Sequence, residues 1–132
     1  MASGGDEIRL TETSLLVSET DAKGMIVYAD ETFVKFSGYS LEELIGSSHN
    51  IVRHPDMPRR AFKELWETIK KGEVWQGFVK NRTKNNKYYW VYATIFPFAK
   101  GHYLSVRRMA TREEVEKYEK MYQEMRSSEG KA

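Results

Sequence analysis

One ten-residue segment in the middle of the chain, His49–Pro58, gathers side chains that can hold an anionic group. It contains two imidazoles, a guanidinium and a carboxylate, which belong to His49, Arg53, His54 and Asp56. It also contains two prolines, each of which fixes its own φ and restricts the residue before it, so a stiff loop is expected. A guanidinium matches phosphate oxygens in a forked geometry, and an imidazole can donate one more hydrogen bond. The segment therefore predicts a loop that binds an anionic ligand.

Two side chains beyond this loop suit an aromatic heterocycle. Trp66 offers a flat surface for stacking, and Asn81 offers a donor and an acceptor to the polar edge of a ring. Trp66 also falls on an apolar helical stripe, where a tryptophan is more often part of the core. Arg53 could in turn serve only to pair with Asp56. The residues alone leave these alternatives open.

Composition excludes several classes of function. With 132 residues, 40% of them hydrophobic, the chain is expected to form one globular domain, and its net charge of +2 gives no reason to expect nucleic acid. The absence of cysteine rules out disulfides and a covalent cysteine–ligand bond. No apolar run is long enough to cross a bilayer, so no direct membrane insertion is expected. No acid, base and nucleophile combine and no metal-ligand spacing is present, so neither an enzyme nor a metal site is predicted.

Periodicity and turn signals predict an α+β fold. Strands are expected at 14–18, 25–28, 75–82, 87–96 and 103–108, and helices at 31–36, 40–46 and 58–71. Ser40 and Glu43 have the spacing of a capping box, and the pair Asn85-Asn86 suits a tight hairpin. We therefore predict a five-stranded antiparallel sheet flanked by short helices and one longer helix.

The two ends of the chain are predicted to lie outside this unit. Residues 1–12 are expected to be a flexible leader, residues 13–110 the folded domain, and residues 128–132 a disordered tail. Residues 111–127 predict an amphipathic C-terminal helix that either docks on its own sheet or pairs with another chain. The basic pairs Lys70-Lys71 and Arg107-Arg108 are expected on solvated faces.

Together these motifs resemble the PAS domains of bacterial aerotaxis, or energy-taxis, receptors. The resemblance runs roughly from Val17 to Tyr118. Its most specific parts are the loop HNIVRHPDMP and the hairpin KNR…YYWV. Its remaining parts are Tyr28–Phe33, Ser37–Ser40, Trp66 and Lys70–Gly77.

The resemblance implies a PAS fold that binds FAD without a covalent bond and senses oxygen, redox or energy state for chemotaxis-type signalling. The cofactor-binding positions of that family map onto His49, Asn50, Arg53, His54, Asp56, Trp66 and Asn81. The implied partner is a HAMP or chemoreceptor signalling module, and a homodimer could form through the PAS domain or the C-terminal helix, which would act as the output element. The implied location is cytoplasmic, within or beside a membrane-bound receptor.

Two other functions remain open at this stage. Some PAS domains bind haem through a histidine, and the candidates here are His49, His54 and His102. The domain could also be a ligand-free interaction module that dimerises through its aromatic hairpin and its C-terminal helix.

The chain also departs from the family pattern. Asp30 and Thr94 stand where asparagine is common in the family, the connection Phe98–His102 is short, and Arg112 replaces an acidic residue. These departures leave the expected fold unchanged but bear on the cofactor and on the output contact.

Overall fold

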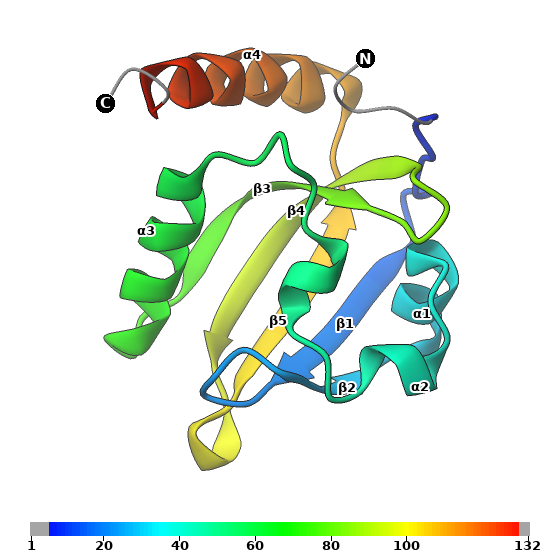
Figure 1. Cartoon of the computed structure of the whole chain (residues 1–132), viewed down its shortest axis with the longest axis vertical. Coiled ribbons are helices and arrows are strands. Elements are labelled where there is room, and N and C mark those ends of the chain that lie inside the picture. The colour runs from blue at the N-terminus through cyan, green and yellow to red at the C-terminus, as the bar shows by residue number, and fades with distance from the viewer. Residues whose placement is uncertain (1–5, 130–132) are drawn as a thin grey trace.

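The computed structural model describes residues 6–129, and its centre is a five-stranded antiparallel sheet (Figure 1). The strand order across the sheet is β2-β1-β5-β4-β3. The strands are β1 (Leu15–Thr20), β2 (Ile26–Ala29), β3 (Trp75–Arg82), β4 (Tyr88–Pro97) and β5 (Tyr103–Met109). The predicted fold class is therefore confirmed, and the strand boundaries agree with the expected ones to within two residues.

Alternation along β3 and β4 gives the sheet two different faces. Val79 and Asn81 point to the face that carries most of the helices, whereas Phe78 and Lys80 point to the other face. Asn86 has a φ of 63° in the turn between the two strands, which confirms the tight hairpin. A short 3₁₀ turn, η2 (Ala99–Gly101), joins β4 to β5.

Two short helices cover the β1–β2 side of the sheet. Helix α1 (Glu31–Ser37) begins at Asp30, whose carboxylate accepts a hydrogen bond of 2.8 Å from the Phe33 amide. Helix α2 (Leu41–Leu44) begins at the predicted capping box of Ser40 and Glu43, which is present in both directions. Between them Gly38 takes a φ of 76°, which ends α1.

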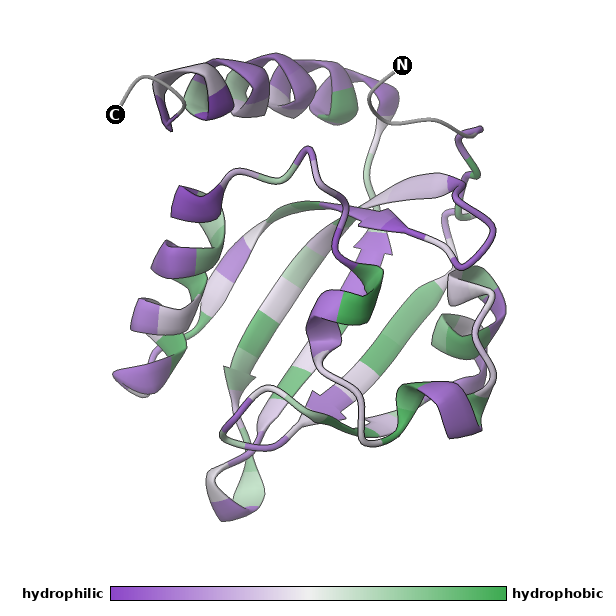
Figure 2. Ribbon diagram, in the orientation of Figure 1, coloured by the Kyte–Doolittle hydropathy of each residue, from purple (hydrophilic) through white to green (hydrophobic). Residues whose placement is uncertain are grey.

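A 3₁₀ segment and a longer helix cover the rest of the same face (Figure 1). The segment η1 (His49–Val52) crosses in front of the sheet, and α3 (Arg59–Lys70) runs beside β3. Ala61, Leu65 and Ile69 are the buried residues of α3. Figure 2 shows the hydrophobic side of α3 turned towards the sheet and its hydrophilic side turned away.

Helix α4 (Arg112–Glu129) packs against the opposite face of β3 and β4. The ring of Tyr118 lies 4.3 Å from that of Phe78, and the Tyr122 hydroxyl donates a 2.7 Å hydrogen bond to the Phe78 carbonyl. Tyr122 also stacks on Trp90. Of the two arrangements predicted for this helix, docking on its own sheet is therefore the one present here.

Both ends of the described chain are held in place. The Ile8 amide donates a 2.8 Å hydrogen bond to the Tyr88 carbonyl, and Leu10 is buried in the core. This contrasts with the flexible leader expected for residues 1–12. Residues 128–129, expected in the disordered tail, continue α4, while residues 1–5 and 130–132 lie outside the described part. No helix between residues 6 and 129 is long and apolar enough to cross a membrane.

Candidate ligand-binding pocket

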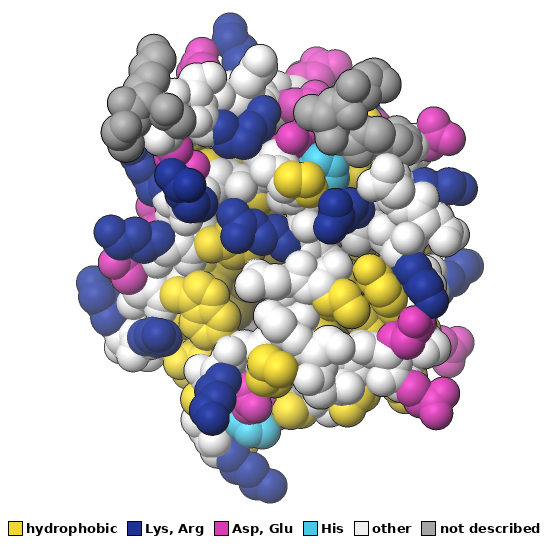
Figure 3. Space-filling model, in the orientation of Figure 1, with side chains coloured by type: hydrophobic (Ala, Val, Ile, Leu, Met, Phe, Trp, Pro, Cys, Tyr) yellow, Lys and Arg dark blue, Asp and Glu magenta, His cyan; other side chains and the backbone are white. Residues whose placement is uncertain are grey.

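A cavity of about 220 Å³ lies between the sheet, α3 and η1. Its walls are largely apolar and include Phe62, Leu65 and Ile69 of α3 and Val79, Ala93 and Ile95 of the sheet. Figure 3 shows the face in front of the sheet, where apolar side chains surround a hollow and several Lys and Arg side chains stand nearby. An apolar cavity with a few polar groups is the usual form of a small-molecule site.

The predicted loop forms one wall of this cavity because backbone contacts fix it at both ends. The His49 amide donates a 3.0 Å hydrogen bond to the Gly24 carbonyl, and the Ser48 side chain accepts from the Asn50 amide. At the far end Arg53 forms an antiparallel bridge with Asn81 of β3. The loop is therefore stiff, as its prolines predict, and it places three of its expected site residues on the cavity: His49, Asn50 and Arg53.

Arg53 is held in an orientation that faces the cavity edge. Its guanidinium lies 4.3 Å from the centre of the Phe62 ring and donates a 3.2 Å hydrogen bond to the Met57 carbonyl. No ion pair joins Arg53 to Asp56 in residues 6–129, so the alternative in which the two residues only pair with each other is absent.

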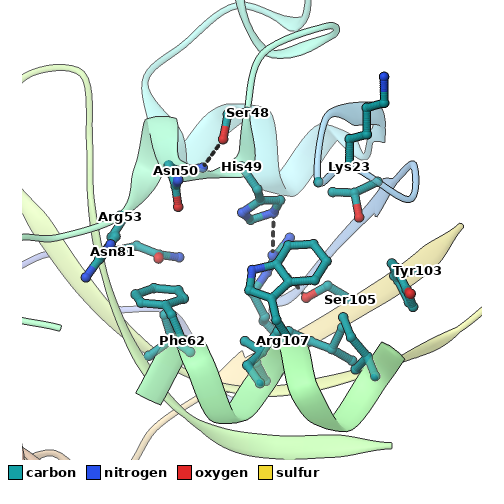
Figure 4. A pocket seen from close by; sticks show the side chains of 18 residues that line it. Lys23, Ser48, His49, Asn50, Arg53, Phe62, Asn81, Tyr103, Ser105 and Arg107 are labelled. Carbon is teal, nitrogen blue, oxygen red and sulfur yellow. Dashed lines mark hydrogen bonds between the residues drawn. The ribbon is translucent and has the colours of Figure 1, made fainter. Parts of the chain in front are cut away.

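Asn81 carries an open hydrogen-bonding group at the cavity. The residue is 3% exposed, and its buried Nδ2 atom makes no standard hydrogen bond within the described chain, although the side chain interacts with the phenol of Tyr89. Figure 4 shows the side chain directed into the space near Phe62 and Asn50. An amide nitrogen has two donors and the Tyr89 phenol can take at most one of them, so Asn81 can donate to a partner from outside the chain.

Trp66 lies at the cavity and also packs against neighbouring residues of the chain. It lines the cavity, and its ring meets that of Tyr103 edge-on at 5.9 Å. It also presses against Gly24, where an added Cβ would lie 3.0 Å from the indole. Gly24 has a φ of 85°, so this close approach and the turn before β2 both favour glycine.

The structure places the two remaining predicted site residues away from the cavity. His54 is completely buried, and its Nδ1 accepts a 2.9 Å hydrogen bond from the Asp56 amide. The Asp56 carboxylate lies 2.8 Å from the Lys80 ammonium on the opposite face of β3. Burial alone would raise the pKa of Asp56, but the hydrogen bond and charge of Lys80 outweigh burial and hold it below its ordinary value. Here His54 and Asp56 fasten the loop to β3.

Arg107 is the pocket residue that sequence reasoning missed, and the expectation of a solvated Arg107 was wrong. The side chain is 2% exposed and lines the cavity from β5. It donates hydrogen bonds of 2.9 Å to Ser18 and 3.1 Å to Ser105, and one of its nitrogens lies 3.2 Å from His49 Nε2 (Figure 4). The period of two along β5, which groups Arg107 with Ser105 and separates it from Arg108, was the available signal.

Burial and charge set the protonation states at this side of the cavity. Burial, helped by the nearby Arg107 charge, lowers the pKa of His49 to about 3, so the imidazole is neutral at pH 7. Its Nε2 can then accept from Arg107. Burial also lowers the pKa of Arg107 to about 10, which still leaves the guanidinium charged. The cavity therefore has a fixed positive charge beside a neutral imidazole.

The structure also locates the positions relevant to the alternative ligands. The described residues contain no group of three or more His, Asp or Glu side chains that could hold a metal ion. His102 contacts Glu19 through its Nδ1 atom and does not line the cavity. Thr94, one of the departures from the family pattern, faces away from the cavity towards Gln76, and Asp30 serves as the α1 cap.

Comparison with known proteins agrees with this geometry. The family model described as the PAS fold matches residues 26–112. The chain is 48% identical over 117 residues to the aerotaxis receptor of Escherichia coli K12. The aligned region covers 86% of this chain and 23% of the receptor. The chain is 29% identical over 102 residues to a nitrogen fixation regulatory protein of Klebsiella oxytoca, covering 74% of this chain and 21% of that protein. The chain thus spans less than a quarter of the length of these relatives.

Solved structures give the same fold. The light-state structure of the blue-light photoreceptor Aureochrome1 LOV superposes with a TM-score of 0.68 at 23% identity, over 81% of this chain and 87% of that one. A light-oxygen-voltage domain studied with a flavin analogue gives a TM-score of 0.68 at 21% identity, over 86% and 87% of the two chains. The family model covers well over half of this chain, from β2 to the start of α4. The chain therefore belongs to the PAS-fold family.

Proposed function

We propose that this PAS domain binds FAD non-covalently in the cavity and senses oxygen, redox or energy state for chemotaxis-type signalling. The observation that carries the proposal is the buried amide of Asn81, which has a donor available at an apolar cavity that the buried cation of Arg107 also lines. The similarity to an aerotaxis receptor and to a domain studied with a flavin analogue supports the same choice of ligand class.

The lining residues fit the parts of a flavin. The apolar walls suit its fused rings, and the donor on Asn81 suits a carbonyl of its pyrimidine edge. Trp66 adds an aromatic surface at the cavity. A bound flavin would supply the redox chemistry, while the protein supplies position, exclusion of water and electrostatics.

The size of the cavity assigns Arg53 to the outer part of the ligand. A volume of about 220 Å³ is below the range of about 300–1,000 Å³ typical of ligand pockets, so it suits the ring system better than a whole dinucleotide. The remainder of FAD would extend along the loop, where Arg53 lies against Phe62. A guanidinium held in this way suits the pyrophosphate oxygens.

Strand β3 offers a route from the cavity to α4. Asn81 faces the cavity and bridges to Arg53, while the preceding residue, Lys80, lies 3.6 Å from Glu119 of α4 on the other face. A change in the contact between the ligand and Asn81 would shift β3 and its contacts with α4. We assign α4 as the output element towards a HAMP or chemoreceptor module of a cytoplasmic, non-enzymatic sensor; a homodimer is compatible with this arrangement.

Neither alternative is favoured by a specific contact. A haem ligand at His49 would require Nε2, which already faces Arg107 and Ser18 at 3.2 and 3.1 Å. A ligand-free dimerisation module would use the apolar stripe of α4, but Val115 and Tyr122 of that stripe are buried against this chain itself. The flavin proposal therefore rests on the cavity, and the alternatives become outcomes of its test.

The first experiment is the visible spectrum of the purified protein, followed by denaturation and mass analysis of any released chromophore. Flavin absorption with released FAD is the expected result. A Soret band would move the assignment to haem, with His49→Ala as the next variant. A colourless protein that takes up no added FAD would reject the flavin proposal, and concentration-dependent association in that protein would favour the interaction module.

The signalling route needs a separate test in the full receptor. Asn81→Ala should alter the response to oxygen, and Gln76→Ala, on the solvent side of the same strand, should leave it unchanged. If Asn81→Ala retains flavin and the response is also unchanged, transmission through Asn81 is wrong even though the cofactor assignment stands.

A further inference from the structure

Arg107 occupies a position that is unusual for a charged side chain. The guanidinium is almost fully buried, and its carbon lies 4.4 Å from the centre of the Phe33 ring. Its hydrogen-bond partners are the hydroxyls of Ser18 and Ser105 and the neutral imidazole of His49. All three partners are uncharged, so they orient the cation without balancing its charge.

No carboxylate among residues 6–129 pairs with Arg107. Asp30 acts on Arg107 through its charge, but its side chain caps α1 through the Phe33 amide. Within residues 6–129 the buried phenol of Tyr89 and the imidazole of His49 also act on Arg107. Burial raises the pKa of Tyr89 to about 12, so the phenol is neutral at pH 7. The Nε atom of Arg107 is buried and has no hydrogen-bond partner. A buried charge normally has a partner of opposite sign, because removing it from water is expensive.

We propose that Arg107 is the counter-cation for negative charge on the bound flavin and makes the pocket bind reduced flavin more tightly than oxidised flavin. This inference rests on the proposed function and adds which residue biases the redox equilibrium. Position and charge together assign the role: Arg107 of β5 lines the same cavity as Asn81 of β3, on the same face of the sheet with β4 between them. A cation close to the ring is one of the means by which a protein tunes a flavin.

Arg107 favours reduction of the bound flavin by two electrons and one proton. An external donor, dithionite in the experiment below, gives the neutral oxidised ring two electrons, and one proton from solvent adds at N5. N1 stays deprotonated, so the ring carries one negative charge shared between N1 and the C2 carbonyl oxygen. A second proton at N1 would neutralise the ring, and a nearby cation disfavours that protonation. Arg107 therefore lowers the number of protons taken up for each pair of electrons.

The test measures the midpoint potential of the FAD-loaded protein during dithionite titration. Arg107→Gln should lower the ratio of reduced-form to oxidised-form affinity at least tenfold, which is a potential about 30 mV more negative for two electrons. Arg107→Lys keeps the charge and should shift the ratio less than threefold. Arg108→Gln is the matched control, because it removes the same charge from the exposed side of the same strand, and it should cause no shift.

A second measurement uses the wild-type protein alone and does not depend on how the variants fold. Its potential should change by about 30 mV per pH unit, as expected for one proton per two electrons, since each pH unit is a tenfold change in proton concentration. A value near twice that would mean that the reduced ring is neutral and would overturn the inference.

The outcomes separate this inference from the function on which it rests. A wild-type protein that binds no flavin overturns both. A protein that binds FAD but whose Arg107→Gln variant keeps the wild-type potential overturns only the role of Arg107. If Arg107→Gln and Arg107→Lys weaken both redox forms equally, Arg107 only positions His49 and joins β5 to β1, and the charge proposal fails.

Discussion

Two buried cations on the same sheet, Lys80 and Arg107, have opposite surroundings. They are 3% and 2% exposed, but Lys80 faces α4 and lies 2.8 Å from Asp56 and 3.6 Å from Glu119, whereas Arg107 faces the cavity among uncharged groups. The charge of Lys80 is balanced within the chain, and that of Arg107 is not. The charges on the α4 face of the sheet are therefore balanced within the chain, whereas the cavity face is arranged for a partner from outside.

The largest expected effect comes from removing the partner of Lys80. Asp56→Ala should lower the free energy of unfolding by about 2–3 kcal/mol, somewhat below the usual 3–5 kcal/mol for a broken buried pair because Asp56 keeps some contact with solvent. Glu119→Ala removes the more distant and more exposed partner and should cost about 0.5 kcal/mol. Urea denaturation of both variants measures the difference; equal losses would show that Asp56 does not balance Lys80.

On the cavity face the expected effect is on binding and not on stability. Asn81→Ala removes a side chain that makes no standard hydrogen bond within the described chain and interacts there with the Tyr89 phenol, so the ligand-free protein should lose little stability. FAD affinity should fall about tenfold, the value of one hydrogen bond of about 1.4 kcal/mol. Gln76→Ala on the opposite face of β3 is the control for both quantities. Fluorescence titration and thermal melts measure them, and a melting temperature that falls while FAD affinity stays constant would reverse the roles of the two faces.

Sequence periodicity predicted the fold and most of the cavity because both depend on regular structure. The period of two in the strands and of 3.6 in the helices, together with the Asn85-Asn86 turn, defines the sheet and places Asn81 and Trp66. The loop has no such period. Its sequence indicates a stiff segment, but it cannot show that Arg53 faces the cavity while His54 and Asp56 face β3 and α4, since that depends on where the loop is fastened.

The burial of Arg107 was not predicted, for a different reason. A pair of adjacent arginines most often lies in solvent, and this prior outweighed the alternation of β5, which puts one of the two on each face. The contact of residues 6–10 with the sheet was hidden in a similar way, because a short polar segment carries no period to reveal that Leu10 is buried. Both cases depend on packing between segments that are distant in the sequence.

The neutral imidazole beside Arg107 gives the cavity face a distinct response to pH. Because the pKa of His49 falls from the ordinary 6.5 to about 3 on folding, the unfolded state takes up the proton first as pH falls. Stability should therefore be lost below about pH 6.5, by about 1 kcal/mol per pH unit. The lowered pKa of Asp56 acts only below about pH 4, near its ordinary value of 3.8, and comparison with a His49 variant separates His49 from the other groups that titrate at higher pH.

His49→Gln should flatten this part of the stability curve, measured as unfolding by urea at pH 6.5 and 5.0. NMR of the wild-type imidazole should show no protonation of His49 across the same range. Protonation of His49 near pH 6 would mean that burial and the Arg107 charge do not hold the imidazole neutral, and it would weaken the contrast with Lys80.

The smallest effect is expected at the end of α4, where this helix contacts α3. Variants there test whether α4 influences the cavity face of the sheet. The Glu129 carboxylate accepts hydrogen bonds of 3.1 and 2.9 Å from the amides of Arg59 and Arg60, at the start of α3. An acidic group is favourable at this end of a helix, and because Glu129 is at the surface its contribution should be small and reduced by salt. Glu129→Gln should lower the melting temperature slightly, and Glu124→Gln on the same helix should not.

Neither variant should change FAD affinity if α4 only completes its own face of the sheet. A weaker affinity for FAD in Glu129→Gln, but not in Glu124→Gln, would contradict this expectation. Since α3 contributes Phe62 and Trp66 to the cavity, loosening its first turn would then reach the ligand, and the end of α4 would belong to the binding site as well as to the stable face. Measuring affinity and melting temperature on the same samples distinguishes these cases, because a purely stabilising contact moves only the second.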